Sequence, residues 1–163
     1  MSAALLDAVR DSLEKIAGAS GLAHTPTAGL TIIRALTPSG LDHALPHPLV
    51  CLVLQGRKQV MMGTDIFTFG AGDSLLITAD VPTVSQIIEA SDEAPYISLA
   101  IDLSPALLTE LMDEISAIPA ADCAPIKIEP TDTEVAEAAL RLMRVLERPA
   151  SAAVLQASLM REL

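Results

Sequence analysis

Aromatic side chains are almost absent from this sequence. They make up 2% of it, with no Trp, whereas hydrophobic residues of all kinds make up 51%. A folded core must therefore be built mainly from Leu, Ile, Val, Ala and Met. Cysteine is scarce too. The two cysteines, Cys51 and Cys123, are too few for a disulfide framework and suit a reducing compartment.

Positive charge is also in short supply. The chain holds 10 Lys and Arg residues against 21 Asp and Glu residues, which gives a formal net charge of −11. This balance opposes binding to a phosphate backbone. We therefore do not expect these residues to bind DNA on their own.

Signals for export or membrane insertion are missing. Asp7, Asp11 and Glu14 stand where a signal peptide needs a basic start and an uninterrupted apolar run. The uncharged stretch 16–33 is broken by Gly, Pro and His, so it is not a membrane span. A cytoplasmic protein without a membrane partner is the expectation.

No catalytic set of residues follows from sequence motifs. The three histidines all precede residue 48, and no G-x-S-x-G motif occurs. A Ser-His-Asp or Cys-His arrangement therefore has no local support. We predict no catalytic residue, no enzymatic activity and no cofactor.

What the sequence does contain is a strand-rich centre between helical ends, which predicts an α+β fold. Residues 1–20 form an N-terminal helix or arm, residues 21–103 a β-barrel, and residues 104–163 a helical segment. The first helix should bury one apolar face, made of Leu5, Leu6, Val9, Leu13 and Ile16. Within the barrel, Leu49–Leu54 is apolar at every position, which predicts burial on both faces of that strand.

Helix-starting and helix-stopping residues divide the C-terminal segment. Ser104 and Pro105 predict a first helix, followed by a loop over residues 117–130 that is rich in Ala and Pro. Thr131 or Asp132 can cap a second helix, which Pro149 should end. A third helix is expected over residues 152–163.

The stretch from His43 to Ser91 has the spacing of a metal-binding β-barrel, in which Gly56 and Gly72 fit the glycines of two cupin motifs. The four metal-ligand positions then fall on His43, Leu45, Leu49 and Thr83. The chain thus resembles a cupin-like barrel of the jelly-roll type. Leu and Thr side chains do not hold a transition metal as imidazole or carboxylate does, so we predict a metal-free barrel whose cavity serves binding.

A more specific resemblance runs through the same stretch. Its elements, in order, are Val53-Leu54-Gln55-Gly56-Arg57-Lys58, Gly63, Phe67-x-Phe69-Gly70-x-Gly72, Leu75-Leu76, Asp80-Val81-Pro82, Glu89-Ala90-Ser91 and Pro95-Tyr96. This series resembles the N-terminal, cupin-like effector-binding and dimerisation domain of AraC-type bacterial transcriptional regulators, over residues 20–163. Phe69 stands where that family usually has Tyr, and Thr83 where it usually has Val.

The resemblance implies three kinds of partner. A small-molecule effector would bind in the barrel, a second copy of the chain would form a homodimer, and DNA would be bound only by helix-turn-helix motifs expected after residue 163. Two other interpretations stay open. One is a metal-free cupin-fold enzyme of the isomerase or epimerase type, and the other is a dimerisation module whose barrel is filled by its own side chains.

Alternation along the strands predicts which side chains would line the cavity. They are His43, Leu45, Leu49, Cys51, Val53, Thr83, Ser85 and Ile87. Because this set is mostly apolar, it favours a small and largely uncharged or aldehyde-like effector. Cys51 fits either a small buried apolar residue or a thiol that senses electrophiles. Arg57 and Lys58 fit either solvated turn charges or contacts to an anionic effector.

An apolar stripe on the helix before Pro149 predicts the dimer interface. Its members are Leu142, Val145 and Leu146. In a two-fold dimer the same patch would meet itself. The alternative is that this stripe packs on the barrel of its own chain.

Overall fold

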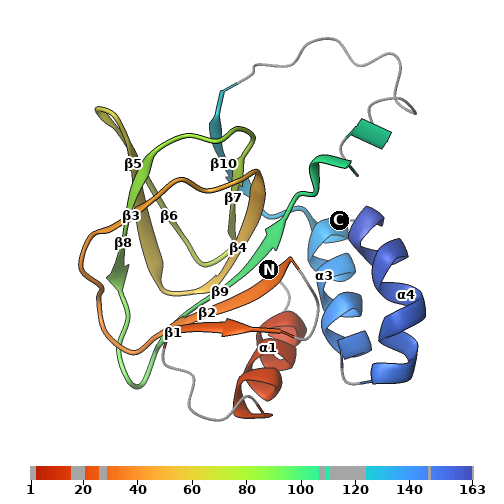
Figure 1. The fold of residues 1–163 in the computed structure, drawn as a ribbon. Helices are drawn as coiled ribbons and strands as arrows, with labels where there is room; N and C mark the ends of the chain where they lie inside the picture. The colour runs from red at the N-terminus through yellow and green to blue at the C-terminus, as the bar shows by residue number, and fades with distance from the viewer. Residues whose placement is uncertain are drawn as a thin grey trace.

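The computed structural model describes residues 3–15, 21–25, 29–106, 109–110, 124–146 and 148–162. Within them, the strands form a six-stranded sheet and a four-stranded sheet, which face one another as the walls of a barrel (Figure 1). Helices lie outside the larger sheet. The prediction of an α+β, cupin-like barrel with an N-terminal helix and a C-terminal helical segment is confirmed.

The larger sheet is antiparallel throughout. Its strands, in chain order, are β1 (Gly21–His24), β2 (Leu30–Ala35), β4 (Leu49–Gln55), β7 (Asp73–Ile77), β9 (Tyr96–Asp102) and β10 (Ile126–Pro130). They are arranged across the sheet in the order β1-β2-β9-β4-β7-β10.

The smaller sheet forms the opposite wall and is also antiparallel. Its strands are β3 (Asp42–Ala44), β5 (Arg57–Met62), β6 (Asp65–Gly70) and β8 (Thr83–Glu89), arranged in the order β3-β8-β5-β6.

Strand β4 has hydrophobic neighbours on both faces. Leu52 and Leu54 belong to a core cluster with the helices, whereas Cys51 and Val53 belong to a second cluster inside the barrel. Successive side chains of a strand point to opposite faces, so an all-apolar strand fits only where both faces are covered. The predicted burial of both faces is confirmed.

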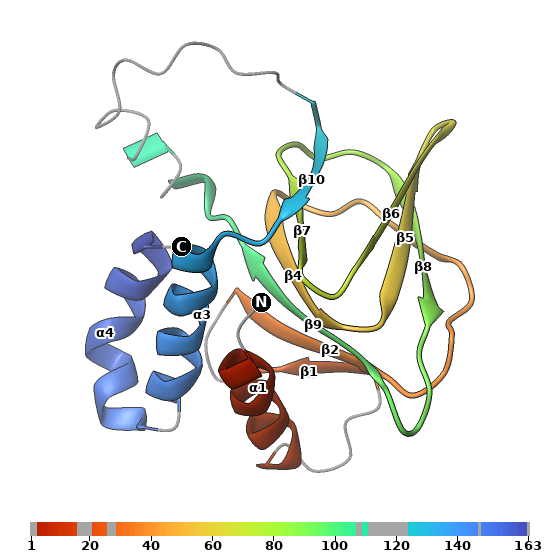
Figure 2. The same ribbon diagram turned by 180° about the vertical axis from the view of Figure 1, so that it is seen from behind.

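Three helices lie on the outer side of the larger sheet (Figure 2). They are α1 (Ala3–Lys15), α3 (Thr133–Leu146) and α4 (Pro149–Glu162). Helices α1 and α3 contribute buried residues to the cluster on the outer face of the sheet, and α4 packs on α3. Leu5, Val9 and Leu13 of α1 are buried, as the apolar stripe predicted. Helices α3 and α4 run side by side in opposite directions because the connection between them is short. None of the helices in the described ranges has the length and apolar character needed to cross a membrane.

The structure differs from the sequence analysis at two places in the C-terminal segment. Residues 126–130, expected in a loop, form β10 and pair with β7 at the edge of the larger sheet. Pro149, expected only to end a helix, is the first residue of α4, where a missing N–H costs nothing. Most of the helix expected from Ser104 lies outside the described residues, as does Cys123.

Gly56 alone connects β4 to β5, and it has a backbone φ of +80°. A Cβ atom at this position would lie 2.5 Å from the Glu89 carbonyl oxygen and 2.9 Å from the Tyr96 Cα. Only glycine permits both this conformation and this approach. The end of β8 and the start of β9 can therefore close tightly over the turn.

Candidate functional site

The barrel strands place some of the predicted cavity residues inside and others not. The side chains predicted to face inward on β4 and β8 are buried: Cys51, Val53, Thr83, Ser85 and Ile87. Leu49, at the start of β4, is half-buried against the same interior cluster. These two strands are continuous through the positions concerned, so alternation of side chains holds along them.

His43 and Leu45 do not face the interior, contrary to the prediction. His43 pairs with Val84, which points away from the inward Thr83 and Ser85, and Leu45 is 60% exposed. The reason is the loop between β3 and β4, where Pro46 and Pro48 interrupt the strand and break the alternation. Both residues instead border a groove of about 540 Å³ beside β3, together with Thr83.

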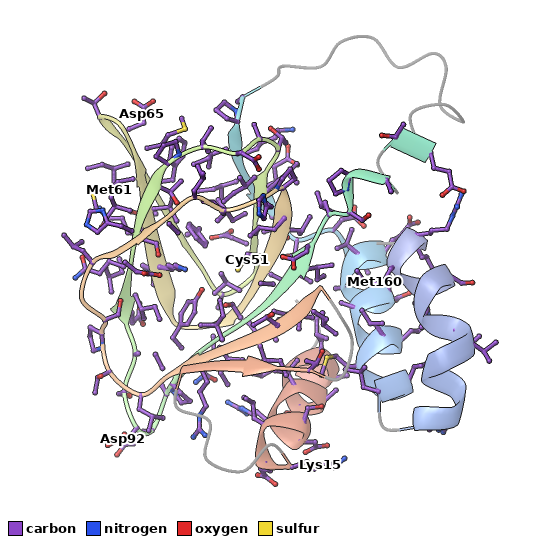
Figure 3. All side chains as sticks on the ribbon, in the orientation of Figure 1. Lys15, Cys51, Met61, Asp65, Asp92 and Met160 are labelled. Atoms are coloured by element: carbon purple, nitrogen blue, oxygen red, sulfur yellow. The ribbon has the colours of Figure 1, made fainter. Side chains whose placement is uncertain are left out.

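The centre of the barrel is filled by its own side chains. The buried interior cluster consists of Cys51, Val53, Val60, Phe69, Leu75, Ile77, Ile87, Tyr96 and Ile126. Figure 3 shows the Cys51 side chain inside the barrel. Tyr96 and Phe69 are the largest of these side chains and are almost fully buried. The eight predicted residues therefore do not surround one common cavity.

Open space lies at one mouth of the barrel. A cavity of about 520 Å³ is bounded by the end of β2, the following residues 36–39, β5 and β8. Its lining includes the predicted Ser85 and Ile87, together with Ile33, Ala35 and Lys58. Aliphatic side chains supply much of this wall, which suits an apolar ligand of modest size.

Lys58 is a wall residue that the sequence analysis left undecided. It pairs with Ile87 on one side and with the buried Phe69 on the other, so it shares their inward face. The register shifts between Arg57 and Lys58, directly after Gly56. Arg57 forms an ion pair with Glu89 at the surface, whereas Lys58 borders the cavity. The inward position of Lys58 could not be predicted from the sequence, because it depends on this shift in register.

Two hydroxyl groups lie behind the wall of this cavity. Tyr96 and Ser98 are both 0% exposed, and neither hydroxyl oxygen has a hydrogen-bond partner among the described residues. Tyr96 pairs with Ala35, and Ser98 pairs with Ile33 and Val53. The hydroxyls are therefore one strand away from residues that line the mouth. Sequence reasoning missed both, although polar residues alternating with Ile97 and Leu99 indicated a second, less apolar face.

Burial controls the protonation of this region. It raises the pKa of the Cys51 thiol above its ordinary value, and the nearby Lys58 ammonium and the Ser98 and Tyr96 hydroxyls oppose the shift only in part. Burial also raises the pKa of Tyr96 well above its ordinary value, as does the neighbouring Cys51. A buried, protonated thiol is a poor nucleophile, so the structure favours the packing interpretation of Cys51 over a sensing thiol.

These shifts predict that alkali destabilises the protein. Because both pKa values are raised by folding, their contribution to stability is complete below the unfolded value, 9.0 for Cys, and is lost as the pH rises above it. We expect the melting temperature to fall above pH 9.0, and to fall less steeply in Tyr96→Phe, which removes one ionisable group. Thermal unfolding over a pH series measures this. Parallel curves for the two proteins would contradict it.

A protein-family model matches most of this sequence. The model of the AraC-type transcriptional regulator N-terminus matches residues 26–163. The chain belongs to this family. The resemblance found in the sequence is thereby confirmed. No curated protein sequence matches the chain.

Solved structures with a similar fold include those of ToxT, although the sequence identity to this chain is low. An apo variant of ToxT from Vibrio cholerae strain SCE256 superposes with a TM-score of 0.54 at 7% identity, covering 75% of this chain and 49% of that one. ToxT from Vibrio cholerae O395, bound to (E)-4-(8-methylnaphthalen-1-yl)but-3-enoic acid, gives 0.53 at 8% identity, covering 73% and 48%. A cupin-2 protein from Shewanella frigidimarina gives 0.41 at 12% identity, covering 58% and 92%. The chain spans about half the length of ToxT.

The sequence predicts a barrel without a bound metal, because three of the four cupin ligand positions carry Leu or Thr. Among the described residues, no group of three or more His, Cys, Asp or Glu side chains is placed to hold a metal ion. Of the four cupin ligand positions only His43 carries a metal-binding side chain, and it is exposed. We expect less than a tenth of an equivalent of Fe, Mn, Ni or Zn in the dialysed protein. Elemental analysis that finds close to one metal per chain would contradict this.

The predicted dimer stripe lies partly in the core of the single chain. Leu142 is 0% exposed and belongs to the cluster between the helices and the larger sheet, so it is not available to a partner. Val145 and Leu146 are half-buried. The stripe turns toward the barrel because α3 must cover the outer face of β4 and β9. Exposed apolar side chains lie instead on α4, where Val154 is 75% and Leu155 44% exposed.

Proposed function

We propose that this chain is the effector-binding domain of an AraC-type transcriptional regulator, and that the effector binds at the barrel mouth. The observation that carries this proposal is the open cavity whose walls are inward-facing residues of β2, β5 and β8. Its volume of about 520 Å³ falls within the range of small-molecule sites. The site involves Ser85 and Ile87 of the predicted set. Of the other predicted residues, Leu49, Cys51 and Val53 pack in the interior of the barrel, and His43, Leu45 and Thr83 border the groove beside β3.

The chemistry of the wall supports a compact ligand with an apolar body. Ile33, Ala35 and Ile87 offer hydrocarbon surface, and Lys58 and Ser85 offer polar atoms. The ToxT domain of similar fold belongs to a protein that was crystallised with a naphthyl-substituted enoic acid.

Regulation in this proposal needs parts beyond the barrel. We propose that DNA binding belongs to a separate helix-turn-helix domain, since the net charge of this chain is −11. We further propose a homodimer in a cytoplasmic setting, formed through the exposed apolar face of α4 around Val154 and Leu155. A dimer would hold two DNA-reading domains at a fixed half-site spacing.

A second candidate is a dimerisation module without an effector. The filled centre of the barrel favours it, because Phe69 and Tyr96 occupy the space that a deep ligand would need. The two candidates differ in whether any compound binds at the mouth. In both of them α4 supplies the dimer contact.

Narrowing the mouth should abolish effector binding. In Ala35→Phe a bulky ring replaces a small, half-buried wall residue. A ligand at a hundred times its dissociation constant stabilises the native state by about 2.7 kcal/mol, and we expect the variant to lose this gain. Ala44→Phe is the matched control, since Ala44 lines the groove beside β3 and is not among the residues that line the cavity at the mouth. Thermal shift with a fragment library measures both. If Ala44→Phe alone loses the shift, the groove is the site, and if no fragment shifts wild type, the dimerisation module is favoured.

A further inference from the structure

Two side chains of opposite charge line the cavity at the barrel mouth, Asp42 on β3 and Lys58 on β5. Asp42 lies directly opposite Ser85, and Lys58 lies directly opposite Ile87. Directly opposed residues of antiparallel strands have their side chains on the same face of the sheet. Since Ser85 and Ile87 are buried on the inward face of β8, both charged side chains belong to that face as well. A carboxylate and an ammonium therefore border one space.

Arg34 also borders this cavity, but its side chain belongs to a different face. It lies opposite Ile97, whose side chain is part of the cluster between the larger sheet and the helices. Among the described residues that line the cavity, Asp42 and Lys58 are thus the charged ones whose side chains face inward.

Neither of these two charges is neutralised by a neighbour. Within the described part of the chain, the side chains of Asp42 and Lys58 form no ion pair and no hydrogen bond. The adjacent Arg57, which points outward, is paired with Glu89 at 3.3 Å. The Lys58 ammonium acts on the buried Cys51 thiol, where it opposes the rise in pKa that burial causes. That interaction places the ammonium on the barrel side of β5.

The spacing of the two charges suits a small molecule that carries both signs. Strand β8 lies between β3 and β5, and the residues of β8 opposite Asp42 and Lys58 are two positions apart. With about 4.8 Å between strands and about 3.3 Å of rise per residue, the two Cα atoms are roughly 12 Å apart. The side chains shorten this gap, and the flexible four-carbon stem of the lysine lets it adjust to a ligand.

A ligand with a single charge matches this cavity less well. An acid that paired with Lys58 would bring a second negative charge near Asp42, and an amine that paired with Asp42 would bring a second positive charge near Lys58. Like charges repel more strongly in a partly enclosed space than in open water. A zwitterion instead forms a charge-assisted hydrogen bond at each end. The aliphatic wall of Ile33, Ala35 and Ile87 then accepts an apolar side chain.

We propose that the cavity at the barrel mouth binds a zwitterionic α-amino acid with an aliphatic side chain, whose carboxylate pairs with Lys58 and whose ammonium pairs with Asp42. The proposal rests on the proposed function, in which the effector enters at the mouth. It replaces the expectation of an uncharged or aldehyde-like effector. It also gives a binding role to Asp42, which the sequence pattern did not single out.

The test compares L-leucine with two analogues that each lack one of its charged groups. 4-Methylpentanoate keeps the carboxylate and lacks the ammonium, whereas 3-methylbutylamine keeps the ammonium and lacks the carboxylate. We expect leucine to bind wild type about tenfold or more tightly than either analogue in NMR titrations, because each analogue loses a hydrogen bond to a charged group. If either analogue binds as tightly as leucine, the proposal is overturned.

Substitution should remove each preference separately. In Asp42→Asn, leucine should lose its advantage over 4-methylpentanoate and keep its advantage over 3-methylbutylamine. In Lys58→Met, the reverse is expected. Asp65→Asn and Arg57→Met are the matched controls, because these exposed charges of the smaller sheet are not among the residues that line the cavity. They should leave all three affinities unchanged. Equal losses in the controls would show that net charge sets the preference, which contradicts the proposal.

Stability without ligand separates a binding role from a structural one. Because neither side chain is paired in the structure, Asp42→Asn and Lys58→Met should melt at the wild-type temperature near neutral pH. A lower melting temperature together with unchanged leucine affinity would assign the two charges to the fold and overturn the proposal.

The outcomes also distinguish this proposal from the proposed function. If leucine does not bind wild type, but another compound shifts its melting temperature and Ala35→Phe removes that shift, the effector site stands and the amino-acid assignment fails. If no compound binds wild type, both fail.

Discussion

Gly56→Ala should destabilise the fold by about 3 kcal/mol or more, a large share of the stability of an ordinary domain. The backbone at Gly56 has φ +80°, which costs an alanine about 1–2 kcal/mol. The new Cβ would also lie 2.5 Å from the Glu89 carbonyl oxygen and 2.9 Å from the Tyr96 Cα. Both neighbours are backbone atoms, so relief requires β8 and β9 to move away from the turn. Urea unfolding followed by circular dichroism measures the loss.

Gly63→Ala provides the matched control for that experiment. Gly63 also has a positive φ, +59°, but a Cβ there would meet nothing within 4 Å. Its alanine variant should lose only the conformational part, about 1–2 kcal/mol. Equal losses in the two variants would show that backbone conformation alone matters, and that the close approach of β8 and β9 over Gly56 does not.

Leu142→Glu should leave the protein unfolded, and should not produce a folded monomer. Leu142 is fully buried between α3 and the larger sheet, among Leu52, Ile97 and Leu99. An unpaired buried charge costs on the order of 3–5 kcal/mol, and the lost packing of the leucine adds to it. Circular dichroism and light scattering together report folding and mass. A folded monomer would place Leu142 at a dimer interface and contradict its position in the core.

Val154→Glu is the counterpart on the other side of the helical layer. Val154 is 75% exposed on α4, so a glutamate there should leave the free energy of unfolding within about 0.5 kcal/mol of wild type. If the exposed face of α4 forms the dimer contact, this variant should be a folded monomer. A folded dimer would exclude that face as the contact.

The sequence predicted the elements whose pattern is set locally. The stripe of α1 and the doubly apolar β4 follow from helical and strand periods, and both are found. Strand β10 was missed although Ile126-Lys127-Ile128-Glu129 alternates apolar and polar residues as a strand does, because the surrounding Ala- and Pro-rich stretch was assigned to a loop as a whole. The strand pairs with β7, a partner about 50 residues earlier in the chain, and so short a segment does not reveal a partner at that separation.

The inward-facing side chains were predicted correctly only where strands are uninterrupted. Ser85 and Ile87 followed correctly from alternation along β8. His43 and Leu45 failed because the loop with Pro46 and Pro48 resets the phase of alternation before β4. Lys58 was left undecided because a single glycine connection and a shifted register turn it inward. Tyr96 and Ser98 depend on the absence of hydrogen-bond partners, which is a property of the packed interior that only three-dimensional structure reveals.

Strand β4 separates the two hydrophobic clusters of the domain. One surface carries Cys51 and Val53, and the other carries Leu52 and Leu54 against the helices. Protein interiors are closely packed and have low compressibility, so a displacement of a strand that is packed on both faces is transmitted to the residues on its other face. A displacement of β4 on its barrel side would therefore also displace the residues against which α1 and α3 pack on the other side.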